Sequence, residues 1–425
     1  TGDALTTGAN NVAVGYAALS AEDEHGYNVA IGNYALQDLN AGGHGYHVAI
    51  GYNAGKEMTT ALRSVLIGAA AGDALTSGSY NIAIGYSALS TEDTGNRNIA
   101  IGYDALRNLN YDGDAYNIAI GFNAGTAVTT GTENIIVGGL AGDSLTTGGL
   151  NVAMGHGALG AEDTGSANVA VGYKALNDLN FDGSAYNVAL GHLTGEKITT
   201  GVQNTLIGAL TGDALTTGSY NVALGYAALS TEDTGNKNIA IGFQALVNQN
   251  IDGDIYNVAI GHNAGMSITT GVSNTFLGGQ AGDAITSAGY SVAIGHLALT
   301  NEDTGQYNTA IGYKALFVQD GGVANTVLGY QAGLSVSTGD DNTIIGGEAG
   351  PALTTGSNNI IIGHDAAASA VGVDNEITLG DANISAFRCA DQSIAALSDG
   401  RDKSEVEESP YGLEFINKLK PVKFT

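Results

Sequence analysis

Short apolar segments recur along the chain at a regular interval. Residues 11–15 read Asn-Val-Ala-Val-Gly, and residues 28–32 read Asn-Val-Ala-Ile-Gly. β-Branched residues that alternate with alanine over a few positions favour a short strand. The glycine that ends each segment, here called the motif glycine, occurs 22 times, at positions 15, 32, 51, 68, 85, 102, 121, 138, 155, 172, 191, 208, 225, 242, 261, 278, 295, 312, 329, 346, 363 and 380.

The spacing of the motif glycines defines the architecture. The step from one to the next is 17, except for steps of 19 at 32→51, 102→121, 172→191 and 242→261, so four coils form a super-repeat that recurs from Gly15 to Gly295. Stacked repeats of one supersecondary unit produce such a register. No segment of residues 1–380 shows a helical apolar period. The sequence therefore predicts an all-β fold, a parallel β-solenoid or β-roll of about 22 coils of 17–19 residues, over residues 1–380.

The apolar positions of each coil predict a thin interior. The residues three and one before the motif glycine are mostly Val or Ile and lie on one face of the strand. The residue between them is usually Ala, and Ala follows three positions after the glycine, with Leu or Gly next. We count about four core side chains per coil from this pattern. In every fourth coil the middle residue is large, as in Leu66, Ile136, Leu206 and Phe276.

Polar residues indicate how neighbouring coils are joined. Asn stands four positions before the motif glycine in 18 of 22 coils, and stacked Asn side chains can hydrogen-bond from coil to coil. Glycine-containing polar turns lie between the strands, for example at Gly95, Gly113 and Gly148. We expect these glycines to supply the positive φ of tight corners.

Composition and charge exclude several classes of protein. Only 3 prolines accompany 65 glycines, which excludes collagen. The net charge of −28 disfavours binding to nucleic acid or to anionic membrane surfaces. No apolar run is long enough for membrane insertion as a helix. The single cysteine, Cys389, excludes an internal disulfide framework, and we expect no cofactor.

The repeats contain few residues whose pattern indicates a metal site or a catalytic site. Calcium could bind acidic turns, but their composition varies between super-repeats, which favours solvated corners; the best pairs are Asp112 with Asp114 and Asp252 with Asp254. Paired acids such as Glu92-Asp93 and Glu162-Asp163 recur once per super-repeat as turns. Glycosidase chemistry needs two carboxyl groups in one pocket, so the repeats are not expected to form an enzyme.

An aromatic or histidine residue often follows the motif glycine directly. This pattern predicts a partly exposed aromatic ladder along the stack. Two alternatives remain: copies of one histidine could meet on a threefold axis and hold a metal, and tyrosine columns could stack on carbohydrate. The column includes Tyr16, Tyr52, Phe122, His156, His192, Tyr226, His262, His296 and His364.

The repeated Asn-Val-Ala-Ile-Gly motif resembles the YadA-like heads of trimeric autotransporter adhesins and similar repeats in phage fibres. The likeness covers residues 1–380. It implies a left-handed parallel β-roll packed as a homotrimer, although the coils here are longer than the family unit. A thin solenoid would also gain stability by burying apolar surface against identical copies.

The C-terminal segment has a different pattern. Residues 381–397 form a junction, and residues 398–425 have no repeat motif. Ser409 is a candidate N-cap with Pro410 at the first helical position, and Leu413, Ile416 and Leu419 lie on one apolar flank, which predicts a short α-helix that ends before Pro421.

Residues 398–403 read Ser-Asp-Gly-Arg-Asp-Lys and resemble the opening of the endosialidase-type intramolecular chaperone domain of phage tail spikes and fibres. The resemblance implies autoproteolysis between Leu397 and Ser398, with Ser398 as nucleophile and Lys403 as base. Asp399 and Arg401 would support them. Such a lysine must be neutral to act. The segment from Ser398 onward is too short for a folded chaperone domain, so it is expected to be only the start of one.

Taken with these resemblances, the sequence predicts a structural and adhesive fibre protein. The expected setting is the tail fibre of a virion, outside the cell, with a chaperone that assists trimerisation. The expected partners are two further copies of the chain and a host surface receptor, either a glycan or an outer-membrane component. The alternative is a bacterial trimeric surface adhesin or extracellular appendage.

Overall fold

The computed structural model describes residues 1–386 and 388, which are all-β and contain no helix. The chain divides into two compact units, Thr1–Ala382 and Asn383–Thr425, and the described residues of the second unit form neither strand nor helix. The strands are β1 Val12–Val14, β2 Val29–Ile31, β3 Val48–Ile50, β4 Val65–Ile67, β5 Ile82–Ile84, β6 Ile99–Ile101, β7 Ile118–Ile120, β8 Ile135–Val137, β9 Val152–Met154, β10 Val169–Val171, β11 Val188–Leu190, β12 Thr205–Ile207, β13 Val222–Leu224, β14 Gly235–Asn236, β15 Ile239–Ile241, β16 Gly253–Asp254, β17 Val258–Ile260, β18 Thr275–Leu277, β19 Val292–Ile294, β20 Thr309–Ile311, β21 Thr326–Leu328, β22 Thr343–Ile345, β23 Ile360–Ile362 and β24 Ile377–Leu379.

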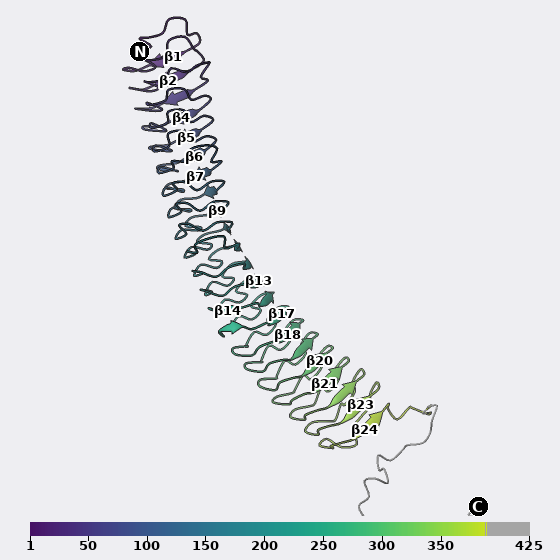
Figure 1. The fold of residues 1–425 in the computed structure, drawn as a ribbon. Helices are drawn as coiled ribbons and strands as arrows, with labels where there is room; N and C mark the ends of the chain where they lie inside the picture. The colour runs from purple at the N-terminus through teal and green to yellow at the C-terminus, as the bar shows by residue number, and fades with distance from the viewer. Residues whose placement is uncertain (387, 389–425) are drawn as a thin grey trace, which may run out of the picture. The chain divides into compact units, whose positions relative to one another are not determined.

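All strands except β14 and β16 belong to one 22-stranded parallel sheet. Each motif strand pairs with the next motif strand along the chain, so that Val12 pairs with Val29 and Ala13 with Ala30. Figure 1 shows the same progression, with the strands stacked in chain order within the first unit. The short strands β14 and β16 pair separately, beside one of the longer coils. This topology confirms the predicted parallel β-solenoid and the position of its strands.

The middle residue of each motif strand from β2 to β23 is buried in the core. Ala83, Ala100 and Ala119 are fully buried, whereas the flanking Val or Ile residues are partly exposed, with burial patterns such as that of β8, where Ile135 is 39% exposed. The residues three and one before the motif glycine, which were expected in the core, therefore lie on the outer face of the sheet. The correction has a steric reason, because an interior this thin accommodates alanine at most levels and has no room for two branched side chains.

Large middle residues fit the core because glycines lie beside them. Phe276 is fully buried, and a Cβ added at Gly265 or Gly282 would lie 2.8 or 2.6 Å from its ring. The other two coils of each super-repeat carry leucine in place of these glycines, such as the buried Leu89. The coils with motif glycines 295–346 repeat this pattern with equal steps and are counted below as a fifth super-repeat. The super-repeat is therefore a packing unit in which large and small side chains alternate between neighbouring coils.

The predicted asparagine ladder is present and buried. The Asn134 side chain donates to the Gly148 carbonyl oxygen at 3.0 Å, and its Oδ1 accepts from the Asn151 backbone N–H at 3.1 Å. The backbone N–H of Asn134 in turn donates to Oδ1 of Asn117, in the preceding coil, at 3.0 Å. Where Ser replaces Asn, Ser64 Oγ still accepts from the backbone N–H of the next coil, at 3.3 Å. The ladder satisfies buried backbone groups at the turn before each strand.

The motif glycine is required by contact between successive coils. Gly138 has φ of +139°, a backbone conformation that L side chains rarely adopt. A Cβ at this position would lie 2.5 Å from the carbonyl oxygen of Gly155, the motif glycine of the next coil. Because the same contact recurs from coil to coil, a side chain at any one level would push two coils apart.

Most tight corners are made by residues other than glycine. Tyr80, Ser87 and Leu89 have φ between 50° and 62°, and the equivalent positions of other coils do the same. Gly95 and Gly148 do not adopt positive φ, so the expectation that the turn glycines supply these corners is wrong there. Left-handed conformations cost roughly 1–2 kcal/mol for each L-residue. Backbone hydrogen bonds to the neighbouring coil, such as Leu89 N–H to the Ala105 carbonyl oxygen at 3.0 Å, hold the corners in place.

The ladder makes a testable prediction at Asn134. We expect Asn134→Ala to destabilise the surrounding coils by about 1–3 kcal/mol for each buried group left without a partner. Hydrogen exchange of the backbone amides around β8 and β9 measures this local loss. Asn134→Ser is the matched control, because the chain uses serine at Ser64, and it should cost clearly less. Equal protection in the wild type and the alanine variant would contradict a stabilising ladder.

Candidate functional surfaces

The outer face of the sheet is an apolar strip that runs the length of the stack. We define the outer strip as the residues three and one before each motif glycine, which flank the buried middle residue. Both positions are partly exposed in strand after strand, and Leu277 is 45% exposed. Its most exposed members include Val12, Val14, Ile31, Ile120, Ile135, Met154, Leu190, Ile207, Leu277, Leu328, Ile360, Ile362, Ile377 and Leu379.

The residues that directly follow the motif glycines form the predicted aromatic ladder. From the second super-repeat to the fifth, three rings stack face to face, as in Tyr226, Phe243 and His262, whose successive centroids are 5.5 and 5.1 Å apart. The fourth coil interrupts the stack with a residue that has no ring, such as Ala209 or Gly279. The expected ladder is therefore confirmed as blocks of three rings. Its rings cover each other's faces, which leaves mainly their edges to solvent.

A second column alternates tyrosine with arginine near the N-terminus. Arg63 lies 5.9 Å from the ring centre of Tyr46 and 5.7 Å from that of Tyr80. Arg97 continues the series between Tyr80 and Tyr116, at 5.7 and 5.4 Å. Such cation–π contacts contribute about 0.5–1 kcal/mol each at exposed sites. The column therefore braces the turn edge of consecutive coils.

One glutamate of each super-repeat is buried in the core. The five are Glu22, Glu92, Glu162, Glu232 and Glu302, all with no exposed surface. Glu162 Oε1 accepts from the Gly165 backbone N–H at 2.6 Å, and Oε2 accepts from the Phe181 N–H at 3.2 Å. Glu92 and Glu162 were expected in turns, and the structure adds that their side chains are buried. The sequence signal for this burial is the glycine three residues after each of the last four glutamates.

That glycine provides room for the buried carboxylate. A Cβ at Gly95 would lie 2.5 Å from the Glu92 side-chain carbon Cδ. In the fourth and fifth super-repeats a second polar residue joins the site, because Gln249 donates to Glu232 at 2.9 Å and Gln319 donates to Glu302 at 2.8 Å. The earlier super-repeats carry leucine there, as in the buried Leu109. The glutamates thus act as anchors that bind turn amides.

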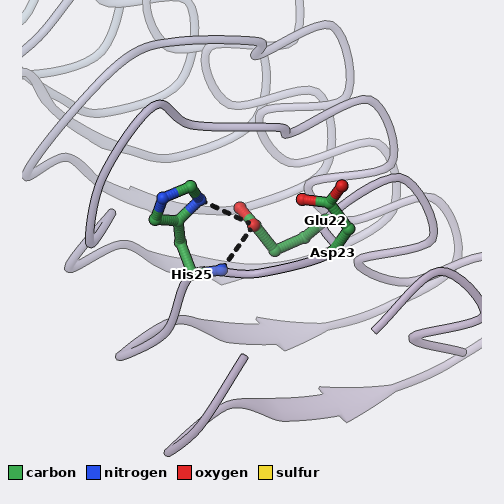
Figure 2. A group of neighbouring side chains, drawn as sticks. All are labelled: Glu22, Asp23 and His25. Atoms are coloured by element: carbon green, nitrogen blue, oxygen red, sulfur yellow. Dashed lines mark hydrogen bonds and ion pairs between the residues drawn. The ribbon is translucent and has the colours of Figure 1, made fainter. Parts of the chain in front are cut away.

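The first super-repeat replaces the glycine with His25, and this change brings together Glu22, Asp23 and His25 (Figure 2). Glu22 Oε1 accepts from the His25 backbone N–H at 3.0 Å and lies 3.4 Å from His25 Nδ1. The possible ligand atoms of the three residues lie within 4.8 Å of one another. The glutamate still holds a turn amide, as its four equivalents do, so the structural role accounts for its position.

Burial shifts the acidity of several carboxyl groups. It raises the pKa of Glu92, Glu162 and Glu232, and the hydrogen bonds from turn N–H groups oppose this effect. Burial likewise raises the pKa of Asp73, Asp143 and Asp213, which occupy one position in three successive super-repeats. These groups favour the protonated form in the folded state more than in the unfolded chain.

The calcium candidates each have a partner from the preceding coil. Asp112 accepts a hydrogen bond from Thr94 at 2.5 Å, and Asp114 forms an ion pair with Arg97. In the fourth super-repeat, Asp252 accepts a hydrogen bond from Thr234. Asp254 forms an ion pair with Lys237, which lowers the pKa of Asp254. A calcium ion would have to compete with these partners.

The predicted autoproteolytic residues lie outside the described residues. This applies to Ser398, Asp399, Arg401 and Lys403, to the bond between Leu397 and Ser398, and to the helix expected after Ser409. Within the part of the chain that is described, no helix is long and apolar enough to cross a membrane. A comparison with models of known protein families gives no match, and a search of curated proteins finds none with significant similarity.

The raised pKa values predict the pH dependence of stability. Between the ordinary pKa of these carboxyl groups and the raised value, the folded chain binds more protons than the unfolded chain. Their contribution to stability is therefore fully present below the ordinary pKa and is lost as the pH rises through the raised value. We expect a higher urea midpoint near pH 5 than at pH 7. A variant with Glu92, Glu162 and Glu232 replaced by Gln should show a smaller pH slope, and an unchanged slope would contradict the assignment.

Proposed function

We propose that the chain is the shaft or head of a homotrimeric fibre, structural and adhesive in function, and that it belongs to a viral tail fibre outside the cell. The observation that carries this proposal is the outer strip, an apolar surface that continues over 22 stacked strands. Monomeric soluble proteins rarely expose contiguous apolar patches beyond a few hundred Å². The proposal therefore includes a covering partner of matching length.

Identical copies fit the outer strip better than an unrelated partner. Every coil contributes the same two positions to the outer strip. In copies aligned side by side, the outer-strip residues of one copy therefore face those of the next copy at every coil. The strip contributes two partly exposed residues from every coil of the stack, and a standard stable interface buries about 800 Å² per partner. The resemblance of the repeats to trimeric adhesin heads supports three copies.

The C-terminal segment completes the fibre proposal. The motif Ser-Asp-Gly-Arg-Asp-Lys at residues 398–403 supports a chaperone that assists assembly and is then removed by cleavage before Ser398. A serine hydroxyl attacks the preceding carbonyl only after a base takes its proton, and Lys403 is the proposed base. The repeat body performs no catalysis in this proposal. Its function follows from length, rigidity and surface.

The oligomer is tested at the outer strip. We expect the wild type to appear in mass photometry at three times the chain mass of 42.7 kDa. Ile207→Lys places a charge in the middle of the strip and should shift the population toward monomers, because an unpaired charge is costly to bury between copies. Thr217→Lys adds the same charge at an exposed turn and should leave the trimer intact. A monomeric wild type would refute the proposal.

The cleavage is tested in the full-length reading frame. Ser398→Ala removes the nucleophile, so we expect one uncleaved product on denaturing gels where the wild type gives two. Lys403→Met should do the same, since it removes the base with little change in side-chain length. Ser404→Ala is the matched control and should be processed normally. Continued cleavage of the Ser398 variant would remove the dyad from the proposal.

A further inference from the structure

A hollow interrupts the surface of the third super-repeat. Its first coil carries glycine at two positions, Gly157 and Gly160, which are two and five residues after the motif glycine. The two glycines form the floor of a hollow of about 310 Å³. The other four super-repeats have side chains at both positions, Ala17 with Ser20, Ser87 with Ser90, Ala227 with Ser230, and Leu297 with Thr300.

The coils above and below supply the walls of the hollow. Leu140 and Asp143 come from the preceding coil, and Lys174 and Asn177 come from the following coil, at the same two positions. A Cβ at Gly160 would lie 3.1 Å from Asn177 Oδ1. The side-chain oxygen of Asn177 is therefore directed into the space that the missing side chain leaves.

The hollow contains two side-chain oxygen acceptors. The Thr300 hydroxyl of the fifth super-repeat donates to Asp283, an equivalent of Asp143, whereas Oδ1 of the other two equivalents, Asp73 and Asp213, is buried without a hydrogen-bond partner. Gly160 takes the place of that threonine, and no side chain among the described residues donates to Asp143. Asn177 uses its Nδ2 group toward Asp178, at 2.5 Å, so its Oδ1 is free to accept from a ligand. Two oxygen acceptors thus face one small space.

Rings and charges around the hollow narrow the chemistry of its ligand. His156 lines it and stacks on Tyr173 with ring centres 5.8 Å apart. The Lys174 ammonium group lies 3.5 Å from Glu196, so its charge is largely matched. The acidic chain and the Asp143 carboxyl group disfavour anionic ligands. Hydroxyl donors beside an aromatic edge suit the site.

We propose that this hollow binds one neutral pyranose ring of a surface glycan. Its volume lies at the lower end of the about 300–1,000 Å³ range of ligand pockets, which suits one sugar unit. Sugar hydroxyls donate to Asp143 and Asn177, and the ring contacts His156. The inference gives the proposed adhesive function a defined site, and it rests on that function for its biological meaning.

The experiment titrates the full chain with glucose, galactose, N-acetylglucosamine and N-acetylgalactosamine, read by saturation-transfer NMR of the sugar and by the His156 ring signals. We expect at least one of these sugars to bind. Gly157→Ser with Gly160→Ser restores the side chains of Ser87 and Ser90, which fold at the same positions, and should weaken binding at least tenfold. Asp143→Asn should also weaken it by removing the charged acceptor.

Ala227→Ser is the matched control, because it makes a comparable change in a coil without a hollow and should leave binding unchanged. If none of the four sugars binds, or if the serine-filled variant binds as well as the wild type, the inference is overturned. Mass photometry of the same samples separates the two proposals. A trimer that binds no sugar overturns only this site, whereas a monomer that binds sugar overturns only the trimer.

Discussion

The contact between successive motif glycines is the constraint on which the rest of the structure depends. Gly138 meets the carbonyl oxygen of Gly155 so closely that no side chain fits between them, and the same contact recurs at the motif glycines from Gly15 to Gly346. Because this contact sets one register for the stack, every position of the repeat becomes a column. The buried asparagines, the aromatic blocks and the outer strip are all columns of this kind, and each one depends on the spacing being maintained.

Stacking in columns also explains why the size of a core residue is matched by its neighbours within the super-repeat. The core is too thin for large side chains at every level, so Phe276 requires glycines at Gly265 and Gly282 beside it. The buried glutamates follow the same logic, since Glu92 requires space at Gly95 and turn amides to bind. Polar and apolar packing thus share the period of the super-repeat. A residue is tolerated in the core when its neighbours one coil away compensate for its size or charge.

Single super-repeats depart from the others at a few positions. The outer strip is uniform, which suits association with further copies that have the same period. The hollow at Gly157 and Gly160 and the cluster around His25 lie at positions where the equivalent residues of other super-repeats differ. In the proposed function, the regular positions build the fibre, and the departure at Gly157 and Gly160 provides the proposed sugar site.

The sequence by itself determined the strands, their parallel order and the asparagine ladder, because a motif repeated 22 times leaves only one consistent stacking. The tertiary structure decided which face of each strand is inside. A strand as short as Ile118–Ile120 has too few residues for its sequence to show which face is buried, and the narrow width of the core selects the alanine face. It also decided that Glu162 is buried and that Leu89 adopts a left-handed corner, because both depend on hydrogen bonds to neighbouring coils. The proposed roles of Ser398 and Lys403 still rest on sequence alone.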